Sequence, residues 1–129
     1  MPKNFQITNT IKDIPPHSGN LFMKIKNFTL GENYDLSLVF QDKKKMLLLN
    51  NIYRNKKKAT DVLSFPLEKE KGEIFICLSE CKKEAKKFKR DYDNFVLFLF
   101  IHALCHLKGM AHGSKMEKEE EKIRLEFKV

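Results

Sequence analysis

The feature that most constrains the fold is an apolar run over residues 95–107 that carries histidines near its end. His102 and His106 are four residues apart, so on an α-helix both imidazoles lie on one face, about a turn from each other. Gly109 follows and suits the left-handed residue that ends a helix. The chain can then reverse and bring His112 back toward the other two, which predicts a His-x3-His-x5-His tripod.

The three histidines predict a metal site. A single histidine on an apolar face is usually a core residue, but three of the four histidines in this chain fall within residues 102–112. Three neutral nitrogens with one open position are typical of catalytic zinc, whereas structural zinc sites have four protein ligands. On a helix Cys105 points about 100° away from its neighbour His106, so we expect a core thiol there. The expected cofactor is one Zn²⁺ ion held by His102, His106 and His112.

The same spacing occurs in zinc peptidases of the pattern H-E-x-x-H-x-x-G-x-x-H, with one difference. Ala103 stands where those enzymes have the glutamate that acts as general base, which argues against peptide hydrolysis by that route. A bound metal can still activate water and polarise a phosphoryl oxygen.

Three segments of the chain resemble the YbeY endoribonucleases, a family of ribosomal RNA maturation factors. Residues 102–112 read HALCHLKGMAH, close to the family's HGxLHLxGYDH. Upstream, Tyr53 and Arg54 precede TDVLSFP at residues 60–66, and GEIFI at residues 72–76 matches the family's G-[DE]-I-x-I. The chain departs from the histidine signature at Ala103, Cys105, Met110 and Ala111.

The resemblance implies a metal-dependent, single-strand-specific endoribonuclease that acts in maturation of the 16S ribosomal RNA 3′ end and in ribosome quality control. Its partners would be single-stranded RNA, the ribosome and ribosome-associated proteins. Arg54 would hold the scissile phosphate and stabilise the transition state. The sequence alone favours a solvated loop arginine at this position, and the resemblance reverses that preference. Lys56, Lys57 and Lys58 would extend the positive track for RNA. The general base is unassigned.

Two other functions stay open. A metallopeptidase-like zinc hydrolase requires an acid such as Glu73 or Asp61 to reach the metal, and a basic RNA-binding ribosome-assembly factor would use the metal structurally. Thr60 and Asp61 are also candidates to accept a hydrogen bond from a metal-bound histidine. The acids near the start of the last helix suit the helix dipole and need no chemical role; they are Glu117, Glu119, Glu120 and Glu121.

Length and charge are consistent with a small basic enzyme. The 129 residues predict one domain, and 25 basic against 17 acidic side chains favour a polyanionic partner, nucleic acid before membrane. Three cysteines without a C-x-x-C pair indicate a reducing compartment. Residues 1–19 lack the apolar core of a signal peptide and residues 95–107 are too few to span a bilayer, so we expect a cytoplasmic protein.

Periodicity and turn residues predict an α+β domain, in which four strands pack with helices around the central apolar helix that carries the histidines. The family resemblance implies that the four strands form one mixed β-sheet. The strands are expected at residues 5–8, 36–40, 62–65 and 73–77, with Pro66 ending the third. Helices are expected to start near residues 18, 43, 79, 95 and 114. The expected caps are Asp42, Ser79 and a capping box formed by Ser114 and Glu117, and Phe88 is expected to face inward.

Overall fold

The computed structural model describes residues 4–56 and 60–129, which form a mixed four-stranded sheet and five helices. The elements in chain order are β1 (Phe5–Asn9), α1 (Gly19–Leu30), β2 (Asp35–Phe40), α2 (Lys43–Arg54), β3 (Val62–Glu68), β4 (Lys71–Ile76), α3 (Leu78–Lys87), α4 (Tyr92–Leu107) and α5 (Ser114–Phe127). The strand order is β1-β2-β4-β3, with β1, β2 and β4 parallel and β3 antiparallel at the edge. The predicted α+β fold with a mixed sheet is confirmed.

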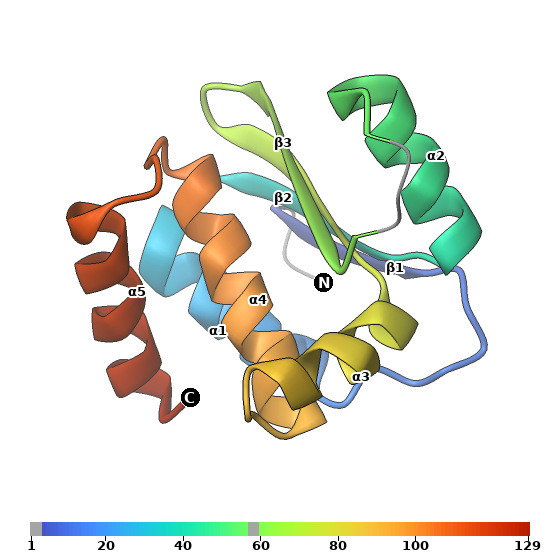
Figure 1. The fold of residues 1–129 in the computed structure, drawn as a ribbon. Helices are drawn as coiled ribbons and strands as arrows, with labels where there is room; N and C mark the ends of the chain where they lie inside the picture. Colours follow the sequence, from blue (N-terminus) through green and yellow to red (C-terminus); the bar gives the residue numbers. More distant parts are fainter. Residues whose placement is uncertain (1–3, 57–59) are drawn as a thin grey trace.

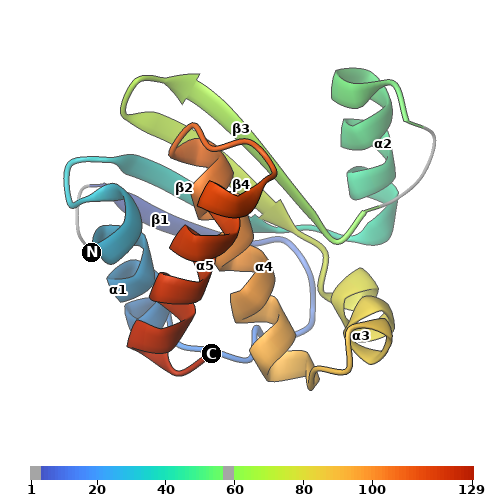
Figure 2. The ribbon, with the colours of Figure 1, turned by 60° about the vertical axis from the view of Figure 1, so that its left-hand side comes forward.

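Helices cover both faces of the sheet, but unequally. Helices α1, α3, α4 and α5 lie on one face of the sheet (Figures 1 and 2). Alternate residues of β2 and β4 belong to the larger core on this face. On the opposite face, Leu63 and Phe65 of β3 and Phe75 of β4 pack in a smaller cluster with Met46 of α2. This alternation is the period of two that strand geometry imposes on side chains.

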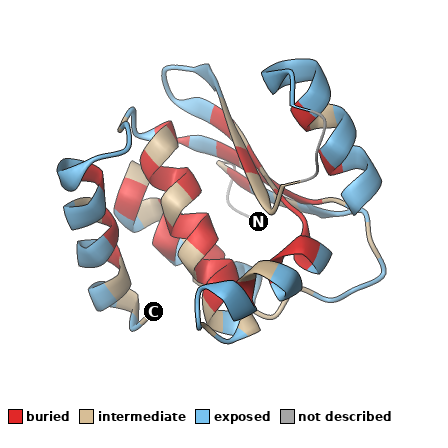
Figure 3. Cartoon of the chain, viewed as in Figure 1, coloured by how far each residue is buried: buried red, intermediate tan, exposed pale blue. Residues whose placement is uncertain are grey.

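Helix α4 lies at the centre of the larger core, and 10 of its 16 residues are buried (Figure 3). A helix that is apolar on nearly all sides is stable only when other elements surround it, and here the sheet and α1, α3 and α5 do so. Asp91 caps its start by accepting a hydrogen bond from the Asn94 N–H. At its end Gly109 has φ 95° and donates to the His106 carbonyl at 2.9 Å, so the predicted glycine stop is confirmed.

The third strand does not end at Pro66, as predicted, but continues to Glu68. Proline lacks the N–H that a central strand must donate, which makes it unsuitable between two neighbours. Strand β3 is at the edge of the sheet, and its pairing with β4 shifts register between Pro66 and Glu68. The prediction was wrong because the edge position depends on strand order.

Two predicted helix starts were also wrong in detail, whereas Asp42 caps α2 as expected. Helix α3 starts at buried Leu78, so Ser79 lies inside the helix and forms no cap. Helix α5 starts after Gly113, whose φ of 153° favours glycine. Ser114 is therefore the first helical residue, and no side chain forms the predicted capping box.

Candidate metal centre

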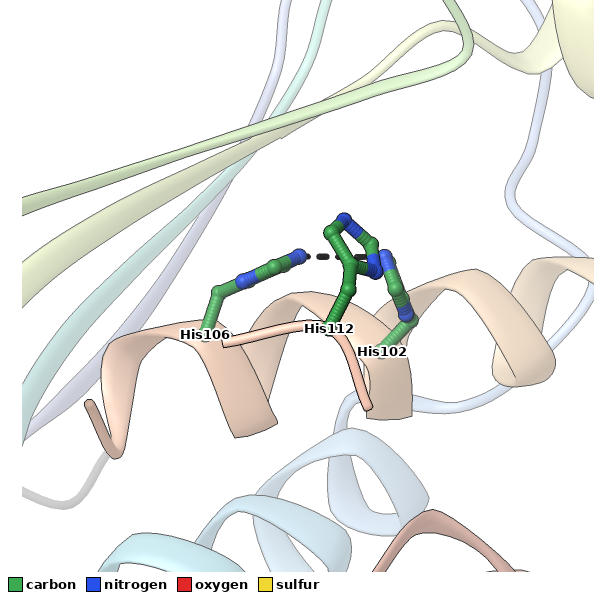
Figure 4. Close-up of side chains that lie close together, drawn as sticks. All are labelled: His102, His106 and His112. Carbon is green, nitrogen blue, oxygen red and sulfur yellow. Dashed lines mark hydrogen bonds between the residues drawn. The ribbon is translucent and has the colours of Figure 1, made fainter. Parts of the chain in front are cut away.

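The three histidines of the tripod converge as predicted. His102 and His106 extend from the last two turns of α4, and His112 approaches them from the turn that follows Gly109 (Figure 4). One ligand nitrogen from each lies within 4.8 Å of the others. The ring centroids of His102 and His106 are 4.6 Å apart. The ring centroid of His112 lies 5.3 Å from that of His102 and 4.8 Å from that of His106.

Hydrogen bonds on the outer side of the His102 and His106 rings determine which of their nitrogens face the space between the three histidines. His102 Nδ1 lies 2.8 Å from Glu120 Oε2, and His106 Nδ1 lies 3.2 Å from the Met110 carbonyl oxygen. Both acceptors favour a proton on Nδ1, which leaves the Nε2 lone pairs free. These two Nε2 atoms are 3.1 Å apart. Two lone pairs that face each other at this distance form a donor set that a divalent cation fits.

Electrostatics also favour the neutral form of His106, which metal binding requires. Burial is the main cause that lowers its pKa, and positive charge on His102, His112 and Arg54 lowers it further. The hydrogen bond to the Met110 carbonyl opposes these effects in part.

Glu120 was missed by sequence reasoning, and the prediction that it has no chemical role does not hold. Glu120 is 7% exposed, and from α5 its carboxylate orients His102 on α4. Met116, Glu120 and Ile123 recur at the spacing of one buried helix face. An acid on that apolar face was the available signal, since a buried carboxylate requires a hydrogen-bonded partner.

The tripod lies in the wall of an open cleft of about 560 Å³. Arg54, the last residue of α2, lines the same cleft although 48 positions separate it from His102. Thr60 and Asp61, which directly precede β3, also line it. Burial, followed by the negative charge of Glu84, raises the pKa of the Asp61 carboxyl above its usual value. The cleft therefore combines metal donors, a guanidinium and an acid that is easily protonated.

Other predicted site residues lie elsewhere. Lys56 is exposed and does not line the cleft, and Lys57 and Lys58 fall outside the described residues. Glu73 is half-buried on central strand β4 and is absent from the cleft wall; its neighbour Ile74 points into the larger core, so Glu73 points to the opposite face of the sheet. Glu73 therefore cannot supply the acid that the metallopeptidase hypothesis requires, whereas Asp61, the other acid named for it, lines the cleft.

Cys105 is a core thiol, as predicted. It is fully buried, and burial raises its pKa to about 12, so the thiolate that would bind a metal is strongly disfavoured. Within residues 4–56 and 60–129, none of the helices is sufficiently long and apolar to cross a membrane.

The fold and the site define an α+β protein with three histidines at the end of its central helix that could hold a metal ion. The family model described as endoribonuclease YbeY matches residues 5–128, and the chain belongs to this family. The chain is 40% identical to endoribonuclease YbeY of Nautilia profundicola over 105 residues, which cover 75% of this chain and 76% of the relative. It is 36% identical to that of Phytoplasma australiense over 118 residues, 84% of this chain and 78% of the relative.

A solved structure has the same fold. The solution structure of TM1509 from Thermotoga maritima matches with a TM-score of 0.66 at 21% sequence identity, over 96% of this chain and 91% of that chain. The predicted family resemblance is thus confirmed by sequence, and the fold by structure.

Proposed function

We propose that this protein is a metal-dependent endoribonuclease that cleaves single-stranded RNA during maturation of the 16S ribosomal RNA 3′ end and in ribosome quality control in the cytoplasm. The observation that carries the proposal is that Arg54 and the three histidines line one open cleft. Relatives named endoribonuclease YbeY, at 40% and 36% identity, support the reaction class. The net charge of +8 suits a polyanionic substrate.

His102, His106 and His112 would hold the ion, and their imidazole nitrogens suit zinc. A bound ion would supply Lewis acidity toward a phosphoryl oxygen and would lower the pKa of water. The three-histidine set leaves a position open toward the cleft, which favours a catalytic over a structural metal.

Two other groups of the cleft would act on the RNA directly. Arg54 would bind the scissile phosphate through its planar guanidinium and stabilise charge that develops there. Asp61 is our candidate general base, because it lines the cleft and its raised pKa makes it a better proton acceptor than an ordinary aspartate.

The test is cleavage of a single-stranded ribosomal RNA fragment and of the matching duplex, with and without a chelator. Wild type should cut the single strand only, and chelation should stop it. Arg54→Ala should retain metal and lower the rate on the order of a hundredfold, and Arg54→Lys should recover only part, because an ammonium lacks the planar fork. Lys56→Ala is the matched control, since Lys56 is exposed outside the cleft wall.

Three results would contradict the proposal. These are cleavage by metal-free protein, equal cleavage by Arg54→Ala and wild type, and hydrolysis of casein in place of RNA. Binding of RNA without cleavage by the fully metal-loaded protein would favour a ribosome-assembly factor with a structural metal. Melting temperatures of all variants serve as the folding control.

A further inference from the structure

The wall of the cleft continues past the histidines into a group of aromatic side chains. Phe88 was expected to face inward, but it is 57% exposed and lines the cleft together with Phe98. One side of its ring packs on Phe95 in a stacked arrangement with centroids 5.4 Å apart. Helix α3 ends at Lys87 and Phe88 is its C-cap residue, so Phe88 begins the turn after the helix and is not held to the buried face. An exposed phenylalanine is thus fixed from behind and open to solvent in front.

Two arginines lie on the neighbouring ring. The guanidinium carbon of Arg90 is 4.2 Å from the centroid of Phe98, and that of Arg124 is 5.3 Å from it. Arg90 donates to the Asn94 side chain, but among residues 4–56 and 60–129 neither arginine forms an ion pair with a carboxylate. Burial and the charge of Arg124 both lower the pKa of Arg90. Two neighbouring cations that form no such ion pair attract an anion.

The position of this group follows from helix geometry. Phe98 precedes His102 by four residues on α4, and Arg124 follows Glu120 by four residues on α5. Since His102 and Glu120 are hydrogen-bonded between the two helices, the Phe98 and Arg124 pair lies one turn, about 5.4 Å, along the same groove. A strand of nucleic acid bound at the histidines would meet this group next.

We propose that Phe88 and Arg124 form a nucleotide-binding subsite for single-stranded nucleic acid beside the metal centre. The base stacks on the exposed face of Phe88, and the phosphate binds Arg124, while Arg90 adds positive charge from behind Phe98. The proposal deepens the proposed function and rests on it for the choice of substrate. Stacking accepts any base, so the subsite contributes affinity and register without sequence specificity.

The experiment measures fluorescence anisotropy of the metal-loaded protein with a labelled single-stranded oligodeoxythymidylate of about eight nucleotides, which is DNA and so is not the substrate of the proposed endoribonuclease. A series of oligomers carries one abasic site at successive positions. In wild type one abasic position should weaken binding about tenfold. Phe88→Ala should weaken binding of the intact oligomer to a similar extent and should be insensitive to that abasic position, and Phe88→Trp should restore both.

Matched controls are available in the chain. Phe28 is 44% exposed, has Lys122 over its ring at 6.0 Å and does not line the cleft, so Phe28→Ala should bind as wild type. Arg124→Gln should lower both the affinity and the salt dependence of binding by about one phosphate contact, whereas Lys122→Gln, which removes the same charge from the same helix, should change the affinity less than twofold.

The subsite is overturned if wild type binds no oligomer, if the abasic series is flat, or if Phe88→Ala keeps the sensitivity of wild type. A flat series with weak binding by Arg124→Gln would also overturn it, because it would leave an anion site without a base platform. Oligomer binding as expected with no RNA cleavage would contradict the proposed endoribonuclease function and leave the subsite standing. RNA cleavage by Phe88→Ala with an unchanged KM would contradict the subsite and leave the proposed endoribonuclease function standing.

Discussion

Replacement of Glu120 tests whether the metal centre depends on its hydrogen-bonded support. Glu120 accepts a hydrogen bond from His102 Nδ1 at 2.8 Å, and at 7% exposure little water is available to replace it. In Glu120→Ala the imidazole can rotate or change its tautomer, so its Nε2 no longer faces that of His106. Glu120→Gln keeps an acceptor oxygen but loses the charge.

The expected magnitude follows from this contact. Loss of a carboxylate that supports a metal-bound histidine weakens metal affinity by roughly 10- to 100-fold, or about 1.4 to 2.8 kcal/mol. We expect this range for Glu120→Ala and a smaller loss for Glu120→Gln, because a neutral acceptor still fixes the Nδ1 proton. The assay is a competition titration of zinc against a fluorescent chelator at constant pH, with His102→Ala as the reference for loss of a ligand.

Glu121→Ala is the matched control, since it removes the same charge from the next position of α5, where the side chain is exposed. Thermal melting of the metal-free proteins separates unfolding from a specific loss of affinity. The reasoning is refuted if Glu120→Ala binds zinc within twofold of wild type, or if Glu121→Ala weakens binding equally.

Three further predictions concern the described fold. Burial raises the pKa of Asp61 in the folded state, so its ionised form destabilises the protein near neutral pH. Asp61→Asn should therefore raise the melting temperature at pH 7. This rise in melting temperature should disappear below about pH 4, where the carboxyl is neutral in the folded and the unfolded state. Gly72→Ala should cost roughly 1–3 kcal/mol in urea unfolding, because its Cβ would overlap the Tyr34 hydroxyl, and an equal midpoint would count against this packing. A thiol reagent at pH 8 should react only after denaturant is added, since all three cysteines are buried: Cys77, Cys81 and Cys105.

Local periodicity determined the elements and the grouping of the three histidines. The spacing of His102, His106 and Gly109 describes one helix face and its end, and those contacts lie within a dozen residues of one another. The apolar run likewise predicted a central buried helix, because a helix without a polar face must be surrounded. The three ligand positions were accessible from the sequence for this reason.

Packing between distant segments decided the rest. Glu120 acts because α5 lies against α4, Arg54 enters the cleft because α2 ends beside β3, and Phe88 is exposed because it lies beyond the end of α3. Strand order made β3 an edge strand, and packing of Ile74 into the larger core left its neighbour Glu73 on the opposite face of the sheet. Side-chain patterns specify which face of an element is buried, but the partner it meets there depends on how all elements pack together, and the support of the metal site is set at that level.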